Sequence, residues 1–127
     1  SSSRMSRARR FFSLKPPEVR KYLFDAVEAC DLITQFVSNK TFTDYQHDRM
    51  LKSAVERQFE IVGEALIGFL RLAPDLQARI TDARRIIAFR NRLIHGYASV
   101  ADELVWGIVE TNLTVLRREL DALMTEE

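Results

Sequence analysis

The fold is decided by the longest helical pattern in the chain, VERQFEIVGEALIGFLRL, residues 55–72. Its large apolar residues recur at steps of four and three, the spacing of one face of an amphipathic helix. They are Val55, Phe59, Val62, Leu66 and Phe69. The pattern stops at Ala73-Pro74-Asp75, because proline interrupts a helix. Gly63 and Gly68 lie inside it and lower its helix propensity, so we infer that a neighbouring helix packs closely there or requires a gap.

Helical stripes of the same kind lie on both sides of this segment. The first covers residues 19–37 and follows Pro16-Pro17, a pair that is tolerated in a first helical turn. The last runs from Asp102 to the end of the chain, and a short helical piece is expected over residues 76–80. No alternation typical of strands competes with these patterns. We therefore predict an all-α antiparallel bundle of four to five helices, in which residues 16–127 form a single domain.

Capping signals predict where the helices begin and end. Thr43, with Gln46 three residues later, resembles a capping box and predicts the start of the long helix. Asp82 predicts the start of a further helix, and Gly96 stands where a left-handed residue would end it. Ser99 resembles a cap ahead of the last helix.

The charge is unevenly distributed along the chain. The net charge is +1, but five of the 19 basic residues, from Arg4 to Lys15, precede the first acid, Glu18. The remainder has 14 bases against 18 acids, a net charge of −4, so any contact with nucleic acid must rely on a local basic patch. We expect residues 1–15 to form a flexible basic arm, because such a segment buries too little apolar surface to become ordered.

The composition disfavours membrane and secreted proteins. No run of about eighteen apolar residues is present to span a bilayer, and the N-terminal stretch lacks the apolar core of a signal peptide. The single Cys30 cannot pair within the chain and lies among apolar residues, which favours a buried thiol in a reducing compartment. We expect a cytoplasmic protein that contacts no membrane.

The candidate site is the stretch RNRLIHGY, residues 90–97. The fork of the Arg90 guanidinium fits phosphate oxygens, and His95 is able to move a proton near neutral pH. The phenol of Tyr97 is able to bind or accept a phosphoryl group. The chain has only two His and four Gly, so this compact cluster is informative. It indicates phosphate chemistry.

The spacing of the motif favours a dimer. On a straight helix, Arg90 and His95 are about 140° apart around the axis, whereas Asn91 and His95 are about 40° apart. A two-fold interface would instead bring together two copies of each residue, and phosphodiester transfer needs both a proton acceptor and a proton donor. A structural interpretation stays open, in which His95 stabilises a helix end, Arg90 is solvated and Tyr97 holds a loop.

These residues resemble the HepT-like HEPN proteins, the toxins of the MNT–HEPN toxin–antitoxin systems, whose signature is Arg-x4-His-x-Tyr. The signature is complete here as Arg90, His95 and Tyr97. Residues 54–66 resemble the second helix of the family and residues 103–109 the helix after the motif, so the resemblance covers roughly residues 18–124. Two features depart from it. Ala83-Arg84-Arg85 stands where family members often have an aromatic residue, and the basic arm is not typical of the family.

The resemblance implies a dimeric HEPN-like bundle that acts as a metal-independent endoribonuclease without a cofactor. Arg90 would hold the scissile phosphate, and His95 would move the proton when the RNA 2′-hydroxyl attacks. Asn91 would orient His95 or bind phosphate. Tyr97 would be the residue to which an MNT-type nucleotidyltransferase antitoxin adds AMP, which would block the site by charge and volume. The implied partners are therefore a second copy, that antitoxin, and an mRNA or tRNA substrate.

Alternatives to the nuclease are a non-catalytic helical partner, a metal site and a DNA-binding role. In the first alternative, the chain presents a substrate or docking surface to a nucleotidyltransferase that does all the chemistry, and RNA cleavage by the purified protein separates that role from the nuclease. A metal site at His47, which lies near Asp44 and Asp48, is less favoured, because no second His or Cys cluster accompanies it. DNA binding by the chain alone has little support, because no basic recognition helix lies outside the motif helix.

Overall fold

The computed structural model describes residues 15–96 and 100–126, and every regular element within those ranges is a helix. In chain order they are α2 (Pro17–Val37), α3 (Phe42–Gln46), α4 (Arg49–Leu72), the 3-10 helix η1 (Pro74–Arg79), α5 (Ala83–His95), α6 (Asp102–Thr111) and α7 (Leu113–Thr125). The predicted all-α bundle is confirmed. None of these helices is long and apolar enough to cross a membrane.

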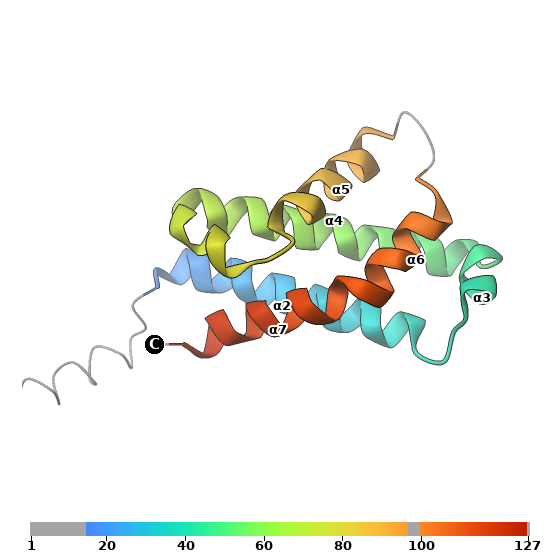
Figure 1. Ribbon diagram of the computed structural model, residues 1–127, viewed down its shortest axis with the longest axis horizontal. Coiled ribbons are helices and arrows are strands. Elements are labelled where there is room, and N and C mark those ends of the chain that lie inside the picture. The colour runs from blue at the N-terminus through green and yellow to red at the C-terminus, as the bar shows by residue number, and fades with distance from the viewer. Residues whose placement is uncertain (1–14, 97–99, 127) are drawn as a thin grey trace, which may run out of the picture.

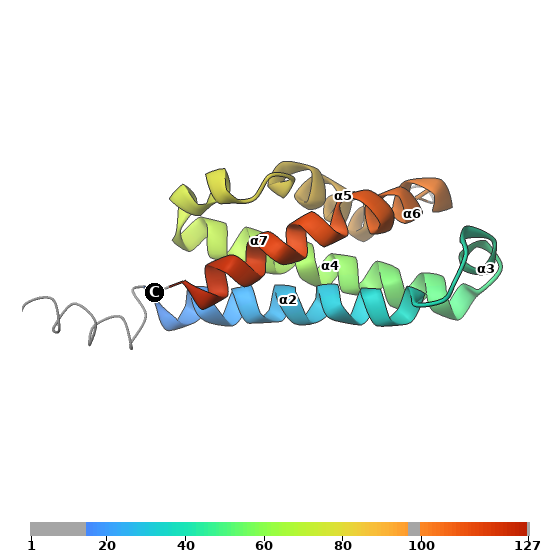
Figure 2. The ribbon, with the colours of Figure 1, turned by 60° about the horizontal axis from the view of Figure 1, so that its bottom comes forward.

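The bundle is built on the antiparallel pair α2 and α4 (Figure 1). α4 also packs against α5, which lies on the other side of α4 from α2 in both views of the ribbon (Figures 1 and 2). α7 lies along α2. α6 comes before α7 in the chain and leads from the end of α5 to the start of α7 (Figure 1). α4 is thus the central helix, with α2 on one side and the helix that carries the motif on the other.

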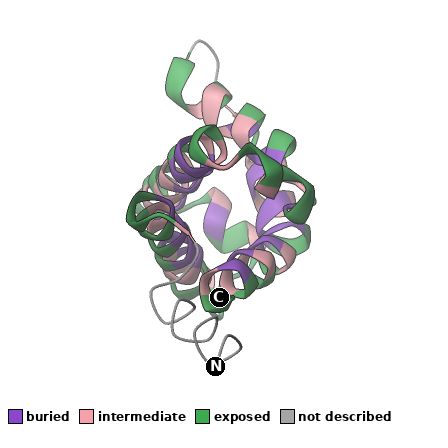
Figure 3. Ribbon diagram, turned by 90° about the vertical axis from the view of Figure 1, so that its left-hand side faces the viewer, coloured by how far each residue is buried: buried purple, intermediate pink, exposed green. Residues whose placement is uncertain are grey.

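The core fills the inside of the bundle, as the end-on view shows (Figure 3). All five residues of the predicted α4 face, from Val55 to Phe69, are buried. The predicted stripe of α2 is buried from Val19 to Ile33. Each fully buried large side chain contributes roughly 1.5–3 kcal/mol through the hydrophobic effect. Burial raises the pKa of the Cys30 thiol to about 12, so this residue stays protonated at neutral pH, as expected for a buried thiol.

The predicted start of the long helix is wrong in two respects: the capping box lies at other residues, and it begins a short separate helix. The capping box is formed by Thr41 and Asp44, not by Thr43 and Gln46. The Thr41 amide donates to Asp44 Oδ2 over 2.9 Å, and the Asp44 amide donates to Thr41 Oγ1 over 3.1 Å. This box caps only the short α3, because the Asp48 carboxylate then accepts from the Leu51 amide over 3.0 Å and starts α4 anew.

His47 lies between these two helices. The sequence disfavours the interpretation of this residue as a metal ligand. It is exposed, and its Nδ1 lies 2.9 Å from the carbonyl oxygen of Thr43. Within the described residues, no group of three or more His, Cys, Asp and Glu side chains is arranged to hold a metal ion. His47 therefore contacts the end of α3.

The predicted single C-terminal helix is interrupted at Asn112, between α6 and α7. This buried side chain donates from Nδ2 to Asp82 Oδ2 over 2.9 Å, and its Oδ1 accepts from the Thr111 hydroxyl over 2.9 Å. Asp82 does precede α5, as predicted, but its carboxylate binds Asn112 and forms no capping bond. The sequence did not reveal this pairing, because the two residues are 30 positions apart.

The remaining boundaries follow the sequence more closely. Gly96 ends α5 in the left-handed conformation, with φ of 62°, as predicted. The expected helical piece over residues 76–80 is the 3-10 helix η1, which starts slightly earlier at Pro74. Ser99 lies outside the described residues, and the residue before α6 is Ala101.

Aromatic side chains join α3 to α6. The ring centroid of Trp106 lies 5.4 Å from that of Tyr45 and 6.2 Å from that of Phe42. Tyr45 is fully buried, and its hydroxyl has no hydrogen-bond partner within the described part of the chain. Burial, followed by the negative charges of Glu56 and Asp102, raises the pKa of Tyr45. This contact fixes α6 beside α3, which itself packs against α4.

Candidate functional site

α5 is held on α4 by a small apolar contact. Ala83, Ile86 and Phe89 are its buried residues, and the Phe89 ring meets Phe59 edge-to-face with centroids 5.2 Å apart. The next residue after Phe89 is Arg90. The motif therefore begins directly after the last buried residue of α5.

Arg90 lies against the gap that Gly63 leaves in α4. A Cβ atom placed on Gly63 would lie 2.3 Å from the Arg90 Cβ and 2.5 Å from its Cγ, so a larger residue would collide with the arginine stem. The gap that the sequence suggested at Gly63 is thus filled by a candidate catalytic side chain. The glycine lowers the helix propensity of α4 by roughly 1 kcal/mol relative to alanine.

The polar end of Arg90 is only partly satisfied. Its Nη1 donates to Asn91 Oδ1 over 2.9 Å, while its Nε is buried without a hydrogen-bond partner among the described residues. A buried unpaired donor costs roughly 1–3 kcal/mol. Packing alone does not favour an arginine at this place, so its presence favours a functional role.

Asn91 contacts Arg90 in this structure. The carboxamide oxygen accepts from the guanidinium, so Asn91 fixes the direction of the neighbouring cation. The role that the sequence suggested, in which Asn91 orients His95 or binds phosphate, stays a prediction.

His95 is the last residue of α5 and is exposed, directly before the left-handed Gly96. Arg90 is half-buried against α4, so the two residues leave the helix in different directions, as the 140° spacing predicted. Tyr97, the expected AMPylation site, lies outside the described residues. Arg84, Arg85 and Arg92 are exposed on the same helix and supply the local basic patch that the acidic body requires.

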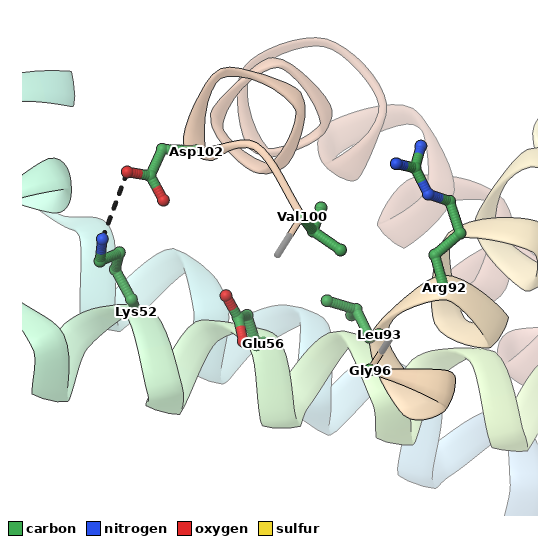
Figure 4. A pocket seen from close by; sticks show the side chains of 7 residues that line it. All are labelled: Lys52, Glu56, Arg92, Leu93, Gly96, Val100 and Asp102. Atoms are coloured by element: carbon green, nitrogen blue, oxygen red, sulfur yellow. Dashed lines mark hydrogen bonds and ion pairs between the residues drawn. The ribbon is translucent and has the colours of Figure 1, made fainter. Parts of the chain in front are cut away.

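A cavity of about 350 Å³ lies beside the C-terminal end of α5 (Figure 4). Its lining residues come from α4, α5 and the start of α6: Lys52, Glu56, Arg92, Leu93, Gly96, Val100 and Asp102. Lys52 Nζ and Asp102 Oδ2 form an ion pair of 3.2 Å across it. Burial, the charge of Asp102 and the charge of Glu60 raise the pKa of Glu56 above its ordinary value.

The sequence did not reveal this cavity. Lys52 and Glu56 stand one helical turn apart, a spacing common on solvated helices. Asp102 is 50 residues from Lys52, and only the tertiary fold brings them together. A second hollow, of about 210 Å³, lies between α5 and α6 and has Arg85 and Arg92 among its lining residues.

The part of the chain that is similar to known proteins includes the motif helix α5. A family model described as Ribonuclease HepT-like matches residues 26–123. The chain is 32% identical over 108 residues to a probable ribonuclease HepT of Thermococcus cleftensis, with 82% of this chain and 94% of that protein covered. It is 24% identical over 106 residues to a putative RNase of Methanocaldococcus jannaschii, with the same two shares covered. No solved structure gives a significant match.

Proposed function

This chain belongs to the HepT-like ribonuclease family, and from that premise we propose that it is an endoribonuclease that cleaves RNA through Arg90 and His95 without a metal ion. The observation that carries the proposal is the position of Arg90, which packs over Gly63 with a buried, unpaired Nε. This arrangement is costly for the fold, and Arg90 stands five positions before the exposed His95 in the sequence.

The proposed reaction is transfer of the phosphodiester to the neighbouring ribose. His95 takes the proton from the RNA 2′-hydroxyl, whose oxygen then attacks the adjacent phosphorus. Arg90 stabilises the charge that develops on the phosphate oxygens. The bond to the 5′-oxygen of the next nucleotide breaks, and that oxygen takes a proton from the His95 of a second copy. The products carry a 2′,3′-cyclic phosphate and a 5′-hydroxyl.

We propose that the active form is a homodimer, because one chain supplies a single motif histidine and the reaction uses two proton-transferring groups. The exposed arginines of α5 would attract the RNA backbone electrostatically to this surface. An mRNA or a tRNA would satisfy these contacts, and we expect the reaction to occur in the cytoplasm.

The proposed regulation is that of a toxin by its antitoxin. A nucleotidyltransferase would activate Tyr97 to attack the α-phosphorus of ATP, releasing pyrophosphate and the phenolic proton and leaving AMP on the tyrosine. Tyr97 stands two residues after His95 in the sequence. The added phosphate would compete with RNA for Arg90 by charge, and the nucleoside would compete by volume.

The first test compares the purified wild type with His95→Ala on a mixture of tRNA and mRNA in EDTA, with the fragment ends identified. We expect His95→Ala to reduce cleavage at least about 100-fold, because a proton-transferring group typically contributes 10²–10⁴-fold. Circular dichroism and gel filtration should show an unchanged fold and oligomeric state. Equal cutting by both proteins would remove His95 from the mechanism.

The same experiment separates the alternative function. If the wild type, shown by mass spectrometry to be free of AMP, leaves RNA intact, the chain acts as the non-catalytic helical partner of a nucleotidyltransferase. Tyr97→Phe tests the regulation by itself. That variant should show no mass increase when it is incubated with the antitoxin and ATP, and an unchanged mass shift would place the modification on another residue.

A further inference from the structure

The cavity beside α5 is lined by two carboxylates and two cations, and one of the carboxylates, Glu56, lies outside its ion pair. Lys52 is engaged by Asp102, and Glu56 forms no ion pair within the described residues. Glu56 is half-buried, and its pKa is raised first by that burial and then by the charges of Asp102 and Glu60. N–H donors of a bound molecule would therefore stabilise its carboxylate.

Two apolar side chains lie beside Glu56 in the cavity, and Arg92 lines it beyond them (Figure 4). Leu93 and Val100 point into the space beside Glu56, whereas the ion pair of Lys52 and Asp102 closes the far end (Figure 4). The volume of about 350 Å³ lies at the lower end of the range of small-ligand pockets. Apolar side chains beside a hydrogen-bond acceptor suit a heterocyclic base, which has apolar faces and N–H groups on its edge.

The cavity also adjoins the motif. Arg92, Leu93 and Gly96 line it, and Gly96 directly follows His95. Glu56 and Gly63 are seven residues apart, which is about two helical turns, so they share the face of α4 that meets α5. Arg90 packs over Gly63, about 10 Å further along the axis. An occupant would therefore lie beside the end of α5 that carries His95, with Arg90 about two turns of α4 away.

We propose that this cavity is a base-binding subsite in which Glu56 selects guanine at the nucleotide next to the scissile phosphate. The inference rests on the proposed ribonuclease function. Guanine presents two adjacent donors, N1–H and N2–H, one for each carboxylate oxygen. Adenine, cytosine and uracil each place an acceptor beside their donor, and that acceptor would be repelled by the carboxylate. Glu56 thereby determines the sequence that is cut, while Arg90 and His95 perform the cut.

The first test measures binding and requires no cleavage. Titration calorimetry with GMP, AMP, CMP and UMP is carried out on the wild type, on Glu56→Gln and on Glu28→Gln, an exposed glutamate of α2 that serves as the matched control. The wild type and Glu28→Gln should bind GMP at least about tenfold more tightly than UMP. Glu56→Gln should lose this preference, because its amide offers one acceptor in place of two. Equal binding of all four nucleotides, or a preference for AMP, would overturn the assignment.

The second test maps cleavage sites on a library of single-stranded RNA. Wild type and Glu28→Gln should cut with guanine enriched at one fixed position beside the cut, and Glu56→Gln should cut with that enrichment lost. Cutting by the wild type without any guanine preference would refute the subsite and leave the ribonuclease standing. A GMP preference that depends on Glu56, in a wild type that cuts no RNA, would support the base subsite and refute the ribonuclease.

Discussion

Gly63 and Gly68 occupy the same helix, are both buried, and are both required by a neighbouring side chain, yet they serve different ends. A Cβ atom on Gly68 would lie 2.5 Å from the ring of Tyr22, which belongs to α2 and packs against the core. A Cβ on Gly63 would meet the stem of Arg90 on α5. One gap accommodates an apolar ring and the other a cation. A glycine inside a helix thus indicates close packing, and only the neighbouring residue indicates function.

The largest expected difference between the two gaps is in catalysis. Gly63→Ala should reduce the cleavage rate about 100-fold per folded molecule, because its Cβ would displace the Arg90 stem, and a misplacement of about 1 Å has effects of that size. Initial rates, normalised to the folded fraction from circular dichroism, provide the measurement. A folded Gly63→Ala protein that cuts at the wild-type rate would show that the position of Arg90 does not matter.

A second difference concerns which atoms collide. At Gly68 the colliding atoms are Cε1, Cζ and Cε2 of Tyr22, so adding Tyr22→Ala removes the collision, and the double-mutant coupling should be about 1–2 kcal/mol. At Gly63 the nearest atom is the Arg90 Cβ, which Arg90→Ala retains, so the coupling there should be smaller. Urea unfolding of both cycles measures the two couplings. Equal coupling energies would mean that α5 moves away from a new Cβ at Gly63 as easily as the Tyr22 ring moves away from one at Gly68.

A smaller effect is expected from Gly68→Ala alone. The new Cβ overpacks the contact, which typically costs roughly 1–3 kcal/mol, while alanine recovers about 1 kcal/mol of helix propensity. The free energy of unfolding should therefore fall by about 1 kcal/mol, and the cleavage rate per folded molecule should match the wild type. A loss of cleavage here comparable to that of Gly63→Ala would break the distinction between the two glycines.

The smallest effect concerns Glu56, two turns before Gly63 on the same face. Its raised pKa means that the native state binds a proton more readily than the unfolded chain, so its contribution to stability is present in acid and is lost as pH rises through the folded pKa. The groups that act on it are Asp102, Glu60 and Lys52. Glu56→Gln should therefore stabilise the protein at neutral pH, with the gain disappearing below the ordinary pKa of glutamate. Melting temperatures of both proteins across this pH range test the sign.

The difference between a local pattern and a contact between distant residues explains which features the sequence predicted. The stripe from Val55 to Phe69 was predicted correctly, because helical periodicity is a local property that core burial reinforces. The gap at Gly63 was inferred, but its occupant was not, since Arg90 is 27 positions away. The capping box was misplaced by two residues, because Thr41 and Thr43 both have a suitable partner three positions later and only the backbone geometry separates them.

The candidate site was predicted in part for the same reason. Arg90 and His95 lie within one short motif, and the structure places Arg90 half-buried on α5 and His95 exposed at the end of that helix. The cavity with Glu56 was missed, because Asp102 and Val100 reach it only through the path of α6. Tyr97 stays a prediction, since it lies outside the described residues.

The aromatic contact between α3 and α6 gives the protein a built-in optical probe. The sequence contains one tryptophan, Trp106, and its ring lies beside the buried Tyr45. The charges that act on Tyr45 belong to Glu56 and Asp102, both of which line the cavity beside α5. Emission from Trp106 should therefore change in wavelength or intensity when the cavity is filled. Nucleotide entry would then be followed by stopped-flow fluorescence on the unlabelled wild-type protein.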